Sequence, residues 1–113
     1  MLVNCACGGL AGPLLAHPVQ ERHYEAELNC VSVLRSSHAA AAAMVARGRG
    51  TILNVASELG FFPFPGAAVY SAGKAFVLNF SATLRHELRG TGVGVTSTVT
   101  PAQPAPKAPV GPG

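Results

Sequence analysis

Three side chains near the middle of the chain have the types and the spacing for proton transfer to a reacting oxygen. Tyr70 and Lys74 are four residues apart, so on a helix they lie on one face, a single turn from each other. An ammonium group nearby favours the phenolate, so we expect Lys74 to lower the pKa of Tyr70 from its usual value of about 10. Ser57 follows an apolar run at 51–56, and its hydroxyl can hydrogen-bond the oxygen that Tyr70 protonates. The pattern predicts general acid–base chemistry near neutral pH.

A second interpretation of Tyr70 and Lys74 needs no chemistry. An aromatic ring that packs beneath a solvated lysine gives the same helical spacing, because the aliphatic part of a lysine readily covers apolar surface. The two interpretations differ in where Lys74 lies, either buried beside the ring or out in bulk water.

The hydrophobic pattern predicts the elements that would hold these side chains. Short apolar runs at 2–5, 51–56 and 93–99 predict three strands, and the middle run is typical of a strand covered on both faces. Helical patterns at 18–44 and 68–89 separate the strands. The order strand–helix–strand–helix–strand predicts an α/β fold, a three-layer parallel sheet with right-handed crossovers.

Each predicted helix has one apolar side. On the first helix this side carries four residues, while Arg22 and Glu25 fall elsewhere and Asn29, a poor helix former, lies in mid-helix. The four residues are Leu28, Val31, Leu34 and Ala42. On the second helix, apolar residues recur every four positions. These residues are Ala72, Phe76, Phe80, Leu84 and Leu88.

Two stretches are predicted to be loops. Residues 8–13 are rich in Gly and Pro, and residues 61–66 hold three Phe, two Pro and one Gly. The Phe side chains either cap the core, as most such residues do, or floor a substrate pocket.

The chemically interesting residues resemble the active-site pattern of the short-chain dehydrogenase/reductase family. That pattern is a Ser followed, after about a dozen residues, by Tyr-x-x-x-Lys, and Ser57, Tyr70 and Lys74 match it in type and spacing. The stretch Asn-Val-Ala-Ser-Glu-Leu-Gly at 54–60 is similar to the family's strand-end motif. Asn29 falls where the family's catalytic Asn lies.

The resemblance extends toward both ends of the chain. Residues 2–8, which include Asn4, look like a degraded Asn-Asn-Ala-Gly motif. Residues 99–102, which include Pro101, look like the Pro-Gly turn that follows the family's sixth strand. The resemblance places the loop at 8–13 near the nicotinamide and substrate, although a plain connector would have the same composition.

The resemblance implies the fold, the cofactor and the residue roles. Residues 1–100 would form a partial Rossmann-like domain, and the Pro-, Ala- and Gly-rich residues 101–113 are expected to form a disordered tail. The reaction would be hydride transfer between NADP or NAD and a small carbonyl or alcohol substrate.

The family's site residues carry over to matching positions. Tyr70 would be the general acid/base, and Lys74 would lower its pKa and bind the nicotinamide ribose. Ser57 would polarise the substrate oxygen, and Asn29 would support a proton relay. Asn4 and Pro101 would join Tyr70 and Lys74 as cofactor contacts.

The family's Gly-rich phosphate loop has no counterpart in this sequence, so a second function stays open. A truncated oxidoreductase lacking that loop is one interpretation. The alternative is an inactive remnant that acts through association with itself or with a full-length relative. The family also predicts a homo-oligomer formed through the two long helices.

Composition excludes several other classes. The sequence has no Asp, so an Asp-based triad and an Asp-rich metal site are excluded. Its net charge of +3 comes from scattered Arg residues, which does not favour nucleic-acid binding. The three cysteines form no CxxC pair and predict reduced thiols in the cytoplasm, with a metal site at Cys5, Cys7 and His17 a distant alternative. No apolar run reaches the ~18 residues of a membrane span, and no signal peptide is evident.

Overall fold

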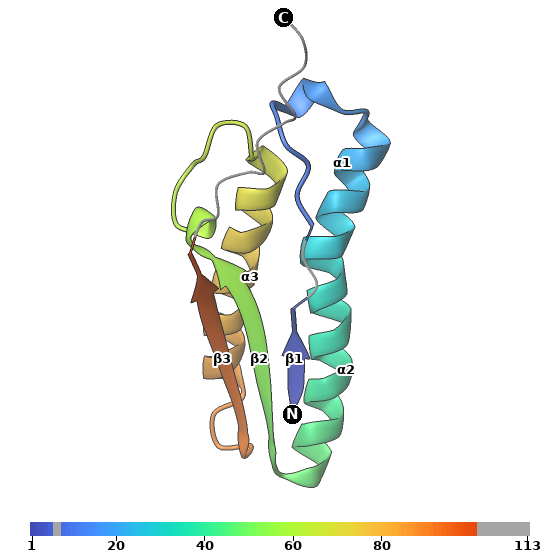
Figure 1. Cartoon of the computed structure of the whole chain (residues 1–113). Helices are drawn as coiled ribbons and strands as arrows, with labels where there is room; N and C mark the ends of the chain where they lie inside the picture. Colours follow the sequence, from blue (N-terminus) through green and yellow to red (C-terminus); the bar gives the residue numbers. More distant parts are fainter. Residues whose placement is uncertain (6–7, 102–113) are drawn as a thin grey trace, which may run out of the picture.

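The fold is a parallel three-stranded sheet whose helices pack on one face, seen in a computed structural model that describes residues 1–5 and 8–101 (Figure 1). The strands lie in the order β1-β2-β3, with Leu2 paired to Ile52 and Ile52 paired to Val95. The elements are β1 (Leu2–Asn4), η1 (Leu14–Ala16), α1 (Val19–Ala26), η2 (Glu27–Val31), α2 (Ser32–Arg47), β2 (Gly50–Ser57), η3 (Glu58–Gly60), α3 (Ala68–Glu87) and β3 (Val93–Thr100). The predicted α/β class and element order are confirmed.

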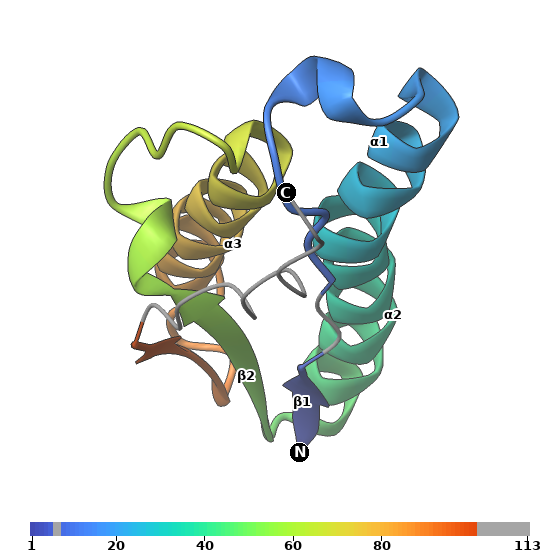
Figure 2. The same cartoon turned by 45° about the horizontal axis from the view of Figure 1, so that its top comes forward.

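Both long helices cover the same side of the sheet (Figure 2). Ile52 and Val95 pack with Met44 of α2 and with Leu84 of α3, which places α2 and α3 on one face. The opposite face carries Leu53 and Val55, which stay half-buried. Within the described residues the sheet therefore has a single helical layer. The sequence predicted that β2 would be covered on both faces, but the described helices cover only one of them.

The first predicted helix is divided by a π-helical turn, η2. The amide of Ser32 donates to the carbonyl of Glu27, five residues back, and this extra residue per turn is the mark of a π-bulge. Such bulges occur frequently at functional sites, and Asn29 lies in this one. The helix then continues as α2 to Arg47, and Gly48 caps it in the left-handed conformation (φ 76°).

The buried face of α1, η2 and α2 differs from the predicted apolar side. Val31 and Leu34 are exposed, whereas the buried line is made mostly of polar and charged side chains. It consists of Arg22, Glu25, Asn29, Val33, Ser37 and Met44. These polar groups are buried because they hydrogen-bond one another, the side chain of Asn4 or the backbone, so apolar periodicity alone placed the wrong face against the sheet.

Helix α3 also buries a narrower face than its apolar stripe predicted. Ser71, Lys74, Val77 and Ser81 are buried, whereas Phe76 and Phe80 of the stripe are half-buried. Small side chains on the buried line let α3 approach its neighbours closely. The rings of Phe76 and Phe80 stack with centroids 5.5 Å apart on the flank of the helix.

The loop between η3 and α3 is irregular, as predicted, but its Phe residues do not cap the core. Phe61, Phe62 and Phe64 are all exposed. The two prolines and Gly66 carry this segment away from the sheet, so the core-capping interpretation is wrong. The predicted tail at 101–113 lies, apart from Pro101, outside the described residues.

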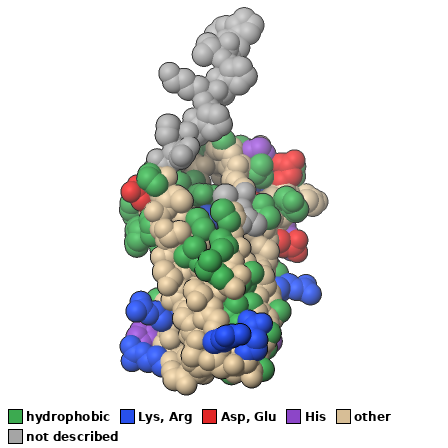
Figure 3. All heavy atoms as spheres, turned by 60° about the horizontal axis from the view of Figure 1, so that its bottom comes forward, with side chains coloured by type: hydrophobic (Ala, Val, Ile, Leu, Met, Phe, Trp, Pro, Cys, Tyr) green, Lys and Arg blue, Asp and Glu red, His purple; other side chains and the backbone are tan. Residues whose placement is uncertain are grey.

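Charge is separated along the molecule. Arg47 and Arg49 precede β2, and Arg85 and Arg89 lie before β3, so these cations share the end at which the parallel strands begin. Figure 3 shows Lys and Arg side chains at the lower end, Glu side chains nearer the upper end, and hydrophobic side chains gathered between them. The site residues lie at the other end of the strands, where β2 finishes at Ser57.

Candidate active site

Strand β2 delivers Ser57 to the carboxyl edge of the sheet. Ser57 is the last residue of β2 and the N-cap of η3, and its Oγ accepts a hydrogen bond from the amide of Leu59 at 3.3 Å. The side chain is buried. Its hydroxyl proton is not used in this bond and remains to be donated to a further acceptor.

Tyr70 and Lys74 lie one turn apart near the start of α3, as their spacing predicts. Lys74 is 3% exposed, and its Nζ lies 5.5 Å from the centroid of the Tyr70 ring. Nζ also donates to the carbonyl of Val55 at 3.4 Å, which fastens α3 to the end of β2. Because Lys74 is buried beside the ring, the interpretation of a solvated lysine above a packed aromatic is wrong.

Gly60 allows η3 to lie directly against α3. A Cβ added at Gly60 would lie 2.7 Å from the backbone C of Lys74 and 2.9 Å from the backbone N of Ala75. Real Cβ atoms do not approach backbone so closely, so only glycine permits this packing. The contact brings the turn that follows Ser57 alongside Lys74.

Asn29 is fully buried in the π-helical turn, not exposed as an isolated polar residue would be. Its Nδ2 donates to the carbonyls of Gly8 at 2.7 Å and Glu25 at 2.8 Å, which fixes the orientation of the carboxamide. Among the described residues, the buried Oδ1 has no hydrogen-bond partner. A buried acceptor left unpaired costs about 1–3 kcal/mol, so this oxygen is a natural place for a water or a ligand donor.

Asn29 also lies against α3 close to Lys74. A Cβ at Gly73 would be 3.0 Å from the Cβ of Asn29. Gly73 therefore allows the π-helical turn and the Lys74 segment of α3 to touch. The structure thus brings Asn29, Tyr70 and Lys74 together, with Ser57 at the adjoining strand end.

Asn4 occupies a structural position within the sheet. Its Nδ2 donates to Ser37 Oγ at 3.1 Å and to Asn54 Oδ1 at 2.8 Å, while its Oδ1 accepts from Ser36 Oγ at 2.6 Å. Asn54 in turn donates to Ser81 of α3 at 2.9 Å. The side chain of Asn4 thus ties β1 to α2 and β2, and its predicted cofactor contact stays a prediction.

Pro101, the other predicted cofactor contact, directly follows β3 and is exposed. The turn that its motif would form continues into residues outside the described part of the chain. No structural observation therefore bears on its predicted role.

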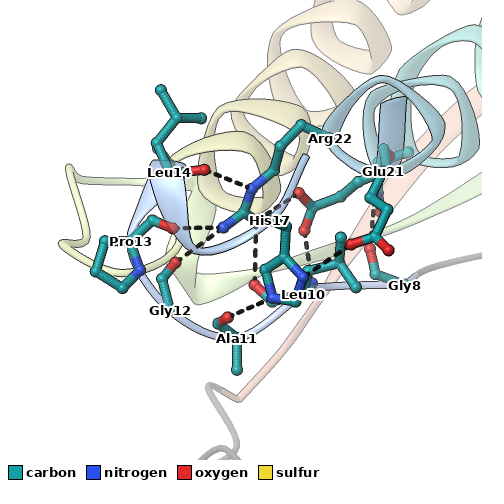
Figure 4. Close-up of polar contacts among 12 residues, drawn as sticks. Gly8, Leu10, Ala11, Gly12, Pro13, Leu14, His17, Glu21 and Arg22 are labelled. Atoms are coloured by element: carbon teal, nitrogen blue, oxygen red, sulfur yellow. Dashed lines mark hydrogen bonds and ion pairs between the residues drawn. The ribbon is translucent and has the colours of Figure 1, made fainter. Parts of the chain in front are cut away.

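Two buried charged residues were missed by the sequence analysis. Arg22 is 6% exposed and Glu25 is 2% exposed, and Arg22 Nη1 lies 3.1 Å from Glu25 Oε1. Figure 4 shows Arg22 directed into the loop from Leu10 to Leu14, where it meets backbone carbonyls. Their spacing of three residues on one helix was the available signal, but opposite charges at that spacing are usually solvent-exposed.

Cys30 is a half-buried thiol near Lys74. Burial raises the pKa of the Cys30 thiol, and the positive charge of Lys74 only partly opposes this effect. The thiolate is the reactive form, so a raised pKa lowers reactivity at neutral pH.

We expect iodoacetamide to label exposed Cys5 about tenfold faster than Cys30 at pH 7.5, in a Cys7→Ser background. Labelling of Cys30 should accelerate as the pH rises toward its raised pKa. Mass spectrometry of digested protein measures both rates, and unfolding in urea should make them converge. Equal rates in the folded protein would contradict the assigned burial and its effect.

The distant alternative of a metal site at Cys5, Cys7 and His17 finds no support in the described residues. Within 1–5 and 8–101 there is no group of three His, Cys, Asp or Glu side chains that could hold a metal. His17 instead contacts Glu21 Oε2 at 2.9 Å and the carbonyl of Ala11 at 3.0 Å, and Cys7 lies outside the described residues. No helix in the described part of the chain is long and apolar enough to cross a membrane.

Comparison with known proteins finds relatives that are dehydrogenases and reductases. NADP-dependent 3-hydroxy acid dehydrogenase YdfG of Salmonella typhi is 41% identical over 99 residues, which are 85% of this chain and 39% of that protein. Sulfoacetaldehyde reductase of Chromohalobacter salexigens is 44% identical over 75 residues, which are 66% of this chain and 30% of that protein. The chain thus spans well under half the length of these relatives.

Solved structures share the fold. The bulky-bulky ketone specific alcohol dehydrogenase from Comamonas testosteroni is 35% identical with a TM-score of 0.85, over 89% of this chain and 41% of that one. A gluconate 5-dehydrogenase from Burkholderia cenocepacia, solved with NADP and tartrate, is 27% identical with a TM-score of 0.82, over 88% of this chain and 39% of that one. The family model described as short chain dehydrogenase matches residues 1–105. Because that match covers almost the whole sequence, the chain belongs to the short-chain dehydrogenase family.

Proposed function

We propose that this chain forms the catalytic part of an NAD(P)-dependent oxidoreductase that interconverts a small carbonyl compound and its alcohol. The observation that carries the proposal is the buried Lys74, whose Nζ lies 5.5 Å from the centroid of the Tyr70 ring. A buried ammonium beside a phenol stabilises the phenolate and prepares the pair for proton transfer. The relatives named above, which are dehydrogenases and reductases, support the same reaction class.

The family resemblance assigns the roles, and the positions of the side chains support them. In the direction of reduction, the Tyr70 hydroxyl gives its proton to the carbonyl oxygen, and in oxidation the phenolate takes it back. Lys74 stabilises the phenolate electrostatically. Ser57 donates the proton of its hydroxyl as a hydrogen bond to the same substrate oxygen. The unpaired Oδ1 of Asn29 holds a water that resupplies protons from the solvent side.

The nicotinamide, when bound, supplies or accepts the hydride. The chain's residues suit the nicotinamide end of such a cofactor, because Lys74 and Tyr70 offer a cation and a hydroxyl beside the Gly8–Leu10 backbone. A Cβ at Gly9 would lie 3.0 Å from Tyr70 Cδ2, so that backbone packs against the ring. Asn4 and Pro101 are included as further contacts by family resemblance. The relative solved with NADP makes NADP the first cofactor to test.

The proposal is tested by comparing NADPH oxidation by the parent chain with that by a Ser57→Ala variant. We expect the parent to oxidise NADPH in the presence of a panel of small ketones, aldehydes and 3-oxo acids. Loss of the Ser57 hydrogen bond should lower that rate by about 10²-fold. Thr83→Ala, an exposed change on α3, is the matched control and should leave the rate unchanged.

Absorbance at 340 nm measures the turnover. No NADPH or NADH oxidation by the parent with any member of the panel would contradict the proposal for this chain. Equal rates for the parent and Ser57→Ala would remove Ser57 from the mechanism.

A second candidate function is association with another copy of the chain or with a longer relative. It is favoured by the half-buried Leu53 and Val55, on the face of the sheet that no described helix covers, and by the Phe76–Phe80 stack on α3. The family suggests the two long helices as the interface of a homo-oligomer. Light scattering after size exclusion tests this association, and a well-folded monomer at high micromolar concentration would contradict it.

The half-buried thiol of Cys30 is consistent with a reducing, cytoplasmic location.

A further inference from the structure

Arg22 and Glu25 form a buried ion pair whose remaining hydrogen bonds all reach the loop between β1 and α1. Arg22 donates to four carbonyls of that loop: Leu10 at 3.3 Å, Gly12 at 3.1 Å, Pro13 at 2.7 Å and Leu14 at 3.2 Å. Glu25 Oε2 accepts from the amide of Leu10 at 2.7 Å. Figure 4 shows these bonds converging on Arg22 from around the loop.

The loop depends on these side chains because its backbone forms no sheet or helix of its own between Gly8 and Pro13. Each backbone polar group there needs a partner, and Arg22 supplies donors to carbonyls of the loop, among which that of Pro13 also accepts from the amide of Ala16. A guanidinium is suited to this task because its five N–H groups are held in a rigid plane. The pair therefore specifies one conformation for the loop.

The other side of the same segment is fixed by Asn29. Its Nδ2 donates to the carbonyl of Gly8, two residues before Leu10. Gly9 lies between these two attachment points, and its backbone packs against the ring of Tyr70, since a Cβ added there would lie only 3.0 Å from Cδ2. The position of Gly9 against Tyr70 thus depends on anchors at both Gly8 and Leu10.

We propose that Arg22 and Glu25 are positioning residues for the Tyr70 site. They hold Gly9 against the Tyr70 ring and so set one wall of the space in which Tyr70 meets its substrate. The proposal rests on the function proposed above. The position of Gly9 against the Tyr70 ring can nevertheless be measured without any activity. A purely stabilising ion pair would have no such effect on Tyr70.

The decisive variant separates positioning from stability. Replacing a buried ion pair with apolar residues of similar size is often neutral or stabilising for the fold. The double variant Arg22→Met/Glu25→Leu should therefore stay folded, with an unchanged unfolding midpoint in urea, while the loop loses all five of its bonds to the pair. Glu25→Gln, which keeps an acceptor for the Leu10 amide, is a milder second variant.

Tyr70 can be observed directly because the sequence has two tyrosines and no tryptophan. In a Tyr24→Phe background, tyrosine fluorescence reports on Tyr70 alone, and Tyr24 is an exposed residue. We expect acrylamide quenching of Tyr70 to rise at least about twofold in the double variant and less in Glu25→Gln. Hydrogen exchange at the amides of residues 8–14 should accelerate at least about tenfold.

A matched control is His23→Ala, which removes an exposed ion pair with Glu27 from the same helical segment without touching the loop. It should change neither quenching nor exchange. In the kinetic arm, the double variant should raise the KM for the carbonyl about tenfold, with a smaller change in kcat, because substrate binding needs the wall that the loop forms.

The outcomes separate this proposal from the proposed function. A folded double variant with unchanged Tyr70 quenching and unchanged exchange at 8–14 would overturn the positioning role, whatever the activity. If the parent shows no turnover, the oxidoreductase function fails, but quenching and exchange still decide whether Arg22 and Glu25 position the loop. If the double variant unfolds, the same quenching and exchange measurements are made on Glu25→Gln. Unchanged quenching and exchange in that variant would then overturn the positioning role.

Discussion

Replacing Tyr70 by Phe is expected to lower NADPH-dependent carbonyl reduction by about 10³-fold, the range typical for loss of a general acid. Phe keeps the ring that packs against Gly9 and lies 5.5 Å from Lys74 Nζ, so the fold and the loop should be retained. Only the transferable proton is removed. Initial rates at 340 nm with saturating substrate measure the effect, because a proton-transfer defect appears in kcat rather than in KM alone.

Tyr24→Phe is the control for this substitution, since it removes the other tyrosine hydroxyl from an exposed position on α1. Its rate should equal that of the parent. If Tyr70→Phe retains the parental rate above background, Tyr70 is not the proton donor and the buried Lys74 serves the fold alone. Circular dichroism of both variants confirms that any loss of rate is not a loss of structure.

Gly60→Ala is expected to destabilise the protein by about 2 kcal/mol, the cost typical of forcing an extra carbon into a packed contact. The added Cβ would lie 2.7 Å from the backbone C of Lys74, and backbone cannot move aside as a flexible side chain can. The turn after Ser57 would have to separate from α3. We therefore expect lower activity as well as a lower urea midpoint, because Ser57 and Lys74 move apart.

The matched control for Gly60→Ala is Gly94→Ala on β3. A Cβ at Gly94 meets no atom within 4 Å, and its backbone is not in the left-handed region. This variant should stay within about 0.5 kcal/mol of the parent, as surface changes usually do. Similar midpoints for Gly60→Ala and Gly94→Ala would show that η3 does not pack against α3 as described.

The order and type of the elements could be predicted because local signals agree with the fold. Gly48 ends α2 in the left-handed conformation that a C-cap glycine favours, and the β-branched run of β2 forms the central strand. The pairing of Tyr70 and Lys74 was also predictable, since a spacing of four within one helix fixes their separation whatever lies around them.

The faces that these elements bury could not be predicted in the same way. Apolar periodicity placed Val31 and Leu34 inside, yet both are exposed while Arg22 and Glu25 are buried. A charge can be buried only where partners reach it, and besides Glu25 the partners of Arg22 come from a loop eight to twelve residues earlier in the chain. Its burial is therefore a property of the packed structure rather than of the helix.

The sequence by itself determined the spacing and the order of the candidate site residues, because helix spacing and strand ends are local properties. Tertiary structure decided that Lys74 is buried beside the Tyr70 ring and that Asn29 has a buried oxygen without a partner among the described residues. It also decided that Gly60 and Gly73 let η3 and the π-helical turn pack closely against α3. These features depend on contacts between segments far apart in the chain, where a few tenths of an ångström of backbone position decide whether side chains meet.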